Sequence, residues 1–160
     1  MQVVDPHVHL WNTEKVRYPW LANPKGVYSG NNRFLAQKYD VDDLLRDAGP
    51  IEILKTVDIE ANPADTVAEA RWLQRLADRS GEGNPHRIIA YAELSRPDAP
   101  ELLEHLSSCR NLRGVRQILN VHHDSRFDYV GRDYMQGICG GTCAASRSTT
   151  GPYDLQTYSH

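Results

Sequence analysis

Short apolar runs alternate with amphipathic stretches along most of this chain, and this alternation limits the fold more than any other feature. Residues 2–10, 53–59, 87–94, 113–119 and 153–158 each have the length and the β-branched or aromatic content of a strand. Helix-like segments separate the first four of these runs. Strands that alternate with helices of this size predict βαβ units and a parallel sheet.

The helices are predicted from their end signals and their apolar spacing. The first covers 41–48 and stops at Gly49-Pro50. The second opens with Asn62 as N-cap and Pro63 at the first helical position. The third starts at Asp98. Their apolar faces recur at helical spacing, formed by Val67, Ala70, Leu73, Leu76 and Ala77 in the second helix and by Leu102, Leu103 and Leu106 in the third.

The alternation breaks at residues 137–152, where a helix is due. This segment contains four glycines, five Ser or Thr residues and two cysteines, with neither helical nor strand periodicity. We interpret it as loop or disorder. Motif-like sequence returns after it, so we hypothesise that two compensating frameshifts produced this irregular segment.

Composition sets the broad class. The chain has 160 residues, a formal net charge of −3 and 24% charged residues, which fits one domain and gives no basic excess for nucleic acid. No apolar run approaches the roughly 20 residues of a membrane helix, and the N-terminus shows no signal-peptide pattern. The three cysteines are an odd count without framework spacing, which favours free thiols. We therefore expect a cytoplasmic protein.

The strongest chemical signal lies in the first predicted strand, at Asp5-Pro6-His7-Val8-His9. His7 and His9 are two residues apart, so on a strand both side chains point to the same face. At the carboxyl end of a barrel strand they would converge where such barrels place their active sites. Neutral imidazole is a common zinc ligand, which predicts a metal site. The alternative is two histidines satisfied by hydrogen bonds at a strand end.

Several ordered motifs extend this signal. The stretches DPHVHLW, YPWL, VDIEANP, LRGVRQIL and YDLQTYSH, in this order and spacing, resemble the amidohydrolase-related family, in its branch of lactonases and 2-pyrone-4,6-dicarboxylate hydrolase. The resemblance covers about residues 1–136 and returns at 153–160. It implies a (β/α)8 TIM-type barrel that hydrolyses small cyclic esters or related carboxylated compounds, with His7 and His9 matching the histidine pair of the first strand.

Two departures from the family pattern matter. Relatives that resemble the pyrone dicarboxylate hydrolase keep the histidine pair and work without a metal, so the implied divalent ion, zinc by preference, is absent in some members. The family also has a histidine on strand six and an aspartate on strand eight, the latter as base. A complete barrel takes about 250 residues. We therefore expect residues 1–160 to form one incomplete barrel domain of about five strands.

Four residues are candidates for substrate contact. Arg116 suits a carboxylate or a lactone carbonyl, and the alternative is an ion pair at the barrel end. Glu60 ends the second predicted strand on the expected active face, where a solvated or helix-dipole role is the alternative. In the last predicted strand either Asp154 and Gln156 or Leu155 faces the interior, and the resemblance favours Gln156. The resemblance also places His160 where the family often has a histidine, and the alternative there is a frayed terminus.

Two other pairs of residues are interpreted without a functional role. His122 and His123 follow the fourth predicted strand and are interpreted as a solvent-exposed pair. Cys139 and Cys143 form a C-x3-C spacing without a partner pair, which argues against a metal site.

The function expected from the sequence is hydrolysis of a small lactone or carboxylated substrate, with the 160-residue chain inactive on its own because the strand-eight aspartate is missing. Two rival interpretations remain open. One is a non-catalytic fragment or pseudoenzyme, and the other is a decarboxylase of the same superfamily. Small molecules are the expected partners, with neither nucleic acid nor membrane.

Overall fold

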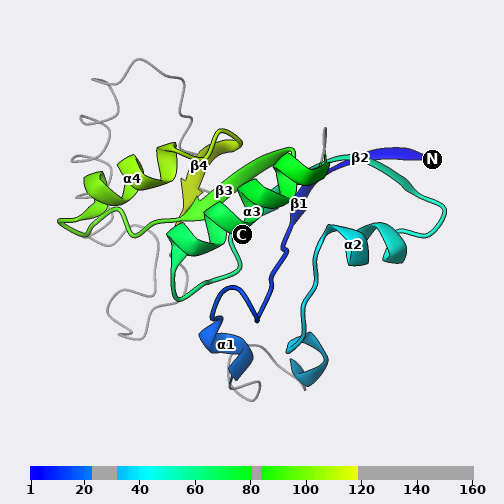
Figure 1. Cartoon of the computed structure of the whole chain (residues 1–160), viewed down its shortest axis with the longest axis horizontal. Helices are drawn as coiled ribbons and strands as arrows, with labels where there is room; N and C mark the ends of the chain where they lie inside the picture. Colours follow the sequence, from blue (N-terminus) through cyan, green and yellow to red (C-terminus); the bar gives the residue numbers. More distant parts are fainter. Residues whose placement is uncertain (23–31, 81–83, 119–160) are drawn as a thin grey trace.

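The fold is a four-stranded parallel sheet with helices between and beside its strands (Figure 1). A computed structural model describes residues 1–22, 32–80 and 84–118 of the chain. The strands are β1 (Gln2–Val8), β2 (Glu52–Ile59), β3 (Arg87–Tyr91) and β4 (Leu112–Arg116). The helices are α1 (Pro19–Ala22), the 3-10 helix η1 (Asn32–Leu35), α2 (Val41–Asp47), α3 (Thr66–Ser80) and α4 (Ala99–Ser107).

The four strands lie in chain order, β1-β2-β3-β4, and every neighbouring pair is parallel. Helix α3 connects β2 to β3, and α4 connects β3 to β4. The predicted parallel α/β arrangement is therefore confirmed for this part of the chain. Residues 153–158, the predicted fifth strand, lie outside the described residues, so the incomplete barrel of about five strands stays a prediction.

The strand boundaries differ from those predicted, mainly at the carboxyl ends. β1 ends at Val8 rather than residue 10, and β3 ends at Tyr91 rather than residue 94. β4 covers Leu112–Arg116 instead of 113–119. In β1 the register slips between Asp5 and Val8, where three steps along β1 match two along β2. Such a bulge re-aims side chains at a strand end, and His7 lies within it.

Helix α2 begins where its cap predicts. The Asp40 carboxylate accepts the Asp42 N–H, and the Asp43 side chain accepts the Asp40 N–H, which forms a reciprocal capping box. The helix ends before Gly49, whose φ of 56° places it in the left-handed region that glycine tolerates best.

The predicted start of the next helix is wrong. Asn62 is not its N-cap, because α3 begins at Thr66 and Asn62 has a left-handed φ of 53°. Asp65 caps the helix instead, since its carboxylate accepts the Ala68 N–H. Asn62 and Pro63 therefore belong to the turn that leaves β2, and this turn proves important for the site.

Helix α4 follows Asp98, as predicted, although the Asp98 carboxylate pairs with Arg96 rather than with the helix backbone. In α4 Leu106 is buried, and Leu102 and Leu103 are partly buried. None of the helices in the described part of the chain is long and apolar enough to cross a membrane.

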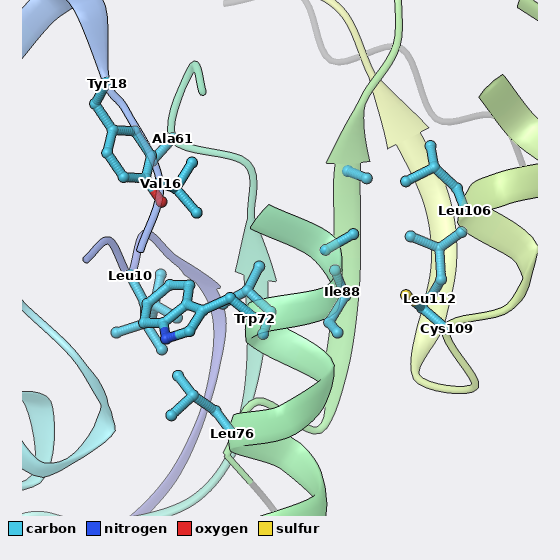
Figure 2. Close-up of a cluster of buried hydrophobic side chains, with 14 of the residues drawn as sticks. Leu10, Val16, Tyr18, Ala61, Trp72, Leu76, Ile88, Leu106, Cys109 and Leu112 are labelled. Atoms are coloured by element: carbon cyan, nitrogen blue, oxygen red, sulfur yellow. The ribbon is translucent and has the colours of Figure 1, made fainter. Parts of the chain in front are cut away.

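The core lies between the sheet and its helices. Figure 2 shows Trp72 and Leu76 of α3 beside Leu10, and Leu106 of α4 beside Leu112 of β4. The predicted apolar face of the second helix is confirmed, because Ala70, Leu73, Leu76 and Ala77 are buried and Val67 packs against the core. Trp72, beside that stripe in the sequence, is buried with it. The cluster is formed by Val8, Leu10, Val16, Tyr18, Leu21, Val41, Ala61, Ala70, Trp72, Leu73, Leu76, Ile88, Ala90, Leu106, Cys109 and Leu112.

Truncating Leu73 should destabilise the chain strongly. Its side chain is 1% exposed, so Leu73→Ala should lower the free energy of unfolding by about 2–5 kcal/mol through lost burial and the cavity left behind. Arg75→Ala, on the exposed face of the same helix, is the matched control and should change it by less than about 0.5 kcal/mol. Urea denaturation monitored by circular dichroism measures both, and equal effects would contradict the described packing of α3.

Candidate metal and substrate site

The two histidines of the first strand meet at its carboxyl end. Their Nε2 atoms lie 3.2 Å apart, and their ring centroids are 5.0 Å apart at an interplanar angle of 71°. His7 is exposed and His9 is half-buried. The expectation that both rings occupy the same side is confirmed, even though His9 lies one residue past the end of β1.

The His9 ring is held by two backbone carbonyl groups. Its Nδ1 lies 2.9 Å from the carbonyl oxygen of Ile59 and 3.1 Å from that of Glu60, where β2 ends. A carbonyl oxygen only accepts hydrogen bonds, so Nδ1 must carry the proton. The neutral ring therefore presents the Nε2 lone pair toward His7.

The surroundings favour the neutral form of His9. Burial lowers its pKa below the ordinary value of 6.5, and the positive charges of His7 and Arg116 lower it further. The hydrogen bonds to the two carbonyl groups act in the opposite direction. A neutral imidazole with a fixed Nδ1–H and a free Nε2 is the form in which histidine binds a metal ion.

A buried ion pair lies next to the histidines. Nη1 of Arg116 donates to Oε1 of Glu60 across 2.8 Å, and the other oxygen, Oε2, accepts the Asn62 N–H at 2.7 Å. The Glu60 side chain is fully buried, whereas that of Arg116 is 32% exposed. Burial raises the pKa of Glu60 in spite of its cationic partner. Glu60 is thus placed to hold Arg116, whose side chain stays partly exposed.

Two further carboxyl groups are buried among these strands and α3. Asp58 is fully buried, and its Oδ2 accepts the N–H of Leu10 at 3.1 Å. Glu69 of α3 is 1% exposed, and its Oε1 accepts the N–H of Ala61 at 3.2 Å. Burial raises the pKa of Asp58 well above its usual range and that of Glu69 to about 8.

Aromatic residues tie the same loops together. Nε1 of Trp20 donates to the carbonyl oxygen of Ala61 across 2.7 Å. The rings of Trp20 and Trp11 meet edge-on, with their centroids 6.0 Å apart. Trp11 also stacks on Tyr39, with ring centroids 5.4 Å apart. The chain after β1 is therefore fastened to the chain after β2.

The histidine pair fits a metal ion in part. Two imidazole nitrogens bound to one tetrahedral zinc are about 3.3 Å apart, given Zn–N distances of about 2.0–2.1 Å. The observed 3.2 Å between the Nε2 atoms matches this separation. Across residues 1–22, 32–80 and 84–118, however, no group of three or more His, Cys, Asp or Glu side chains is arranged to hold a metal. A third protein ligand would have to come from elsewhere.

The structure brings four of the candidate residues together, namely His7, His9, Glu60 and Arg116. The other two, Gln156 and His160, lie outside the described residues, as do His122, His123, Cys139, Cys143 and the irregular segment 137–152. Predictions about them stay predictions. Cys109 is a buried free cysteine of the core.

Sequence reasoning missed the buried carboxyl groups Asp58 and Glu69. A signal for Asp58 existed, because it lies in an apolar strand, two residues before Glu60 and two after Thr56, all three of which are buried. The period of two along a strand put them on one face. Glu69 gave no such signal, since an acidic residue in the first turn of a helix is ordinarily solvated.

Comparison with known proteins gives the context of this arrangement. None of the known protein-family models matches the chain. The uncharacterised protein y4mH of Sinorhizobium fredii is 36% identical over 131 residues, which cover 80% of this chain and 43% of that protein. Among solved structures, Amidohydrolase 2 from Bifidobacterium longum subsp. infantis has a TM-score of 0.50 at 22% identity, covering 75% of this chain and 41% of its own.

An amidohydrolase from Burkholderia multivorans is also similar, in two crystal forms. With bound HEPES it has a TM-score of 0.55 at 23% identity, and with bound zinc 0.55 at 22% identity. Each comparison covers 91% of this chain and 46% of the other. The chain shares the α/β fold of these amidohydrolases. It spans less than half the length of each of these proteins, including y4mH.

Removing Arg116 should cost stability in a pH-dependent way. Arg116→Met leaves the fully buried Glu60 without its cation, and breaking a buried pair in this manner costs about 3–5 kcal/mol. In the variant the folded-state pKa of Glu60 rises further above the unfolded value, so stability is lost as the pH rises through it. Urea denaturation should therefore show a larger loss at pH 8 than at pH 5.

Glu60→Gln is the control for this pair. It leaves a charge on the partly exposed Arg116, which water can solvate, so the loss should be smaller. Because the raised pKa of Glu60 already costs the wild-type chain stability as the pH rises, the loss in Glu60→Gln should be no larger at pH 8 than at pH 5. A pH-independent loss in Arg116→Met would contradict the ion pair described here.

The buried Glu69 should make the chain less stable as the pH rises. Its folded-state pKa of about 8 lies above its ordinary 4.5, so the folded chain binds the proton more tightly. The stability that this proton provides is lost between about pH 4.5 and 8, by at most about 1.4 kcal/mol per pH unit. Glu69→Gln should reduce this slope in urea denaturation. A residual slope is expected because the pKa of buried Asp58 is raised in the same direction. An unchanged slope would place Glu69 in solvent.

Proposed function

We propose that this chain carries the first-strand part of a hydrolase site of the amidohydrolase superfamily, in its lactonase branch. His7 and His9 bind a divalent ion, preferably zinc, and Arg116 receives the carboxylate or carbonyl oxygen of a small cyclic ester or carboxylated substrate. The observation that carries this proposal is the 3.2 Å approach of the two Nε2 atoms while His9 Nδ1 is tied to backbone carbonyl groups. The zinc-containing amidohydrolase of similar fold supports the choice of metal.

The residues present divide the work in a definite way. The Nδ1–H of His9 donates to the carbonyl oxygens of Ile59 and Glu60, which leaves its Nε2 lone pair for the metal ion. His7 offers the facing Nε2 once its own proton is on Nδ1. A bound divalent ion would supply a Lewis acid for the substrate carbonyl and lower the pKa of a water ligand. A base for the attacking water and a third ligand would come from beyond the described residues.

Arg116 supplies the orienting charge. The Arg116 side chain is 32% exposed, and its guanidinium donates to Glu60. The positive charge lies close enough to lower the pKa of His9. A guanidinium binds a carboxylate through two parallel N–H groups, which would fix the direction of an anionic substrate. In this proposal Glu60 acts on the substrate through Arg116.

A second candidate follows from the hydrogen bond between the two rings. With the proton of His7 on Nε2, the His7 to His9 contact is a simple hydrogen bond that requires no metal. The site would then bind its substrate by Arg116 and the histidines alone, as a metal-independent hydrolase.

Metal titration separates the two candidates. Zinc should bind the purified 160-residue chain at one site, and His7→Ala or His9→Ala should weaken this binding by at least about 100-fold, because these two imidazoles are the metal ligands that the described residues supply. His105→Ala, an exposed histidine of α4, is the matched control and should leave affinity unchanged. Competition with a chromophoric chelator measures the affinities. Zinc binding that survives both single substitutions would exclude the metal site and favour the second candidate.

A further inference from the structure

Two buried carboxyl groups lie close to the strand ends that carry the histidines, and the proposed chemistry does not use them. Asp58 is fully buried in β2, and Glu69 is 1% exposed in α3. Placing such groups out of water is costly unless hydrogen bonds compensate. Each makes one clear hydrogen bond, and both bonds go to backbone N–H groups of the loops that carry the site.

The first of these bonds reaches the loop after β1. Oδ2 of Asp58 accepts the N–H of Leu10, the residue directly after His9. The regular ladder between β1 and β2 ends at the pair of Val8 and Asp58, beyond a register slip. The carboxyl group of Asp58 therefore replaces the ladder where it stops, and it fixes the backbone from which the His9 side chain projects.

The second bond reaches the loop after β2. Oε1 of Glu69 accepts the N–H of Ala61, the residue directly after Glu60. The carbonyl oxygen of Glu60 is one of the two that accept from the His9 ring, and the Glu60 side chain accepts from Arg116. Glu69 thus fixes the partner of His9, whereas Asp58 fixes His9 itself.

We propose that Asp58 and Glu69 are a pair of positioning residues, which hold the loops after β1 and β2 in the relative placement that keeps His9 Nδ1 on its carbonyl partners. The inference rests on the proposed function for its consequence, namely that His9 Nε2 is directed at a metal ion. Such outer hydrogen bonds typically change metal affinity by 10- to 100-fold when they are removed.

Two substitutions of Asp58 separate its hydrogen bond to the Leu10 N–H from its packing. Burial, together with the nearby Glu69 and Glu60, raises its pKa, and its Oδ1 makes no hydrogen bond within the described part of the chain. Asparagine has the same shape and keeps an acceptor for the Leu10 N–H. Leucine has a similar branched shape without an acceptor. The pair Asp58→Asn and Asp58→Leu therefore separates the hydrogen bond from the packing.

The test uses the full 160-residue chain and two readouts. In the metal-free chain, 15N chemical shifts of the imidazole rings report the tautomer of His9, with exposed His105 as the internal reference. Wild type and Asp58→Asn should show His9 as the Nδ1–H tautomer, whereas Asp58→Leu should show a mixture. Zinc affinity should stay within about threefold of wild type in Asp58→Asn and fall about 10- to 100-fold in Asp58→Leu.

Glu69 offers a parallel comparison. Glu69→Gln keeps an acceptor for the Ala61 N–H, and Glu69→Met keeps the length without one. The methionine variant should shift the His9 tautomer and weaken zinc binding in the same sense as Asp58→Leu, while the glutamine variant should not. A loss of folding stability in the leucine and methionine variants, with tautomer and zinc affinity unchanged, would overturn the positioning role.

Two further measurements apply if a variant does not fold or if the wild-type chain binds no zinc. If Asp58→Leu fails to fold, hydrogen exchange of the wild-type chain replaces it: the Leu10 amide should be protected as strongly as the amides of β1, and rapid exchange would refute the bond. If wild type binds no zinc, the proposed function fails, and the ring tautomers in the metal-free chain still decide the positioning role.

Discussion

The hydrogen bond from His9 Nδ1 to the end of β2 organises this site. It joins a side chain that follows the first strand to the carbonyl groups of Ile59 and Glu60 on the second, at 2.9 and 3.1 Å. Because carbonyl groups accept only, the bond sets the tautomer, and the tautomer sets which nitrogen faces His7. The geometry of the histidine pair and the placement of Arg116 both depend on how firmly these two strand ends are held together.

The chain stabilises this junction with groups that are expensive to bury. Asp58, Glu60 and Glu69 are all at most 1% exposed, and Oδ1 of Asp58 and Oγ1 of Thr56 make no hydrogen bond within the described residues. An unsatisfied buried polar atom costs about 1–3 kcal/mol. Well-packed apolar residues in place of a buried ion pair are often neutral or stabilising. The buried carboxyl groups fix the loops of the site instead, because each one accepts a hydrogen bond from a particular backbone N–H or from the Arg116 guanidinium.

The sequence was sufficient for the parallel α/β arrangement of the described part and for four of the residues that gather at the candidate site. Periodicity predicted the four strands and the apolar face of α3, and the spacing of His7 and His9 predicted that their rings meet. Prediction from the sequence failed where the local preference of a residue and its tertiary contacts compete. Asn62 has a good N-cap side chain, yet the chain needs it at φ 53° in the turn where Glu60 accepts its N–H. The roles of Asp58 and Glu69 depend on contacts between segments distant in the chain, which no local pattern encodes.

X-ray absorption at the zinc edge of the loaded chain tests the central claim most directly. The account predicts scattering from two imidazole rings with Zn–N distances of about 2.0–2.1 Å, and one ring fewer after His9→Ala. The His105→Ala chain should give the wild-type spectrum. A zinc shell without imidazole, or one that is identical in wild type and His9→Ala, would contradict a metal site built on these two histidines.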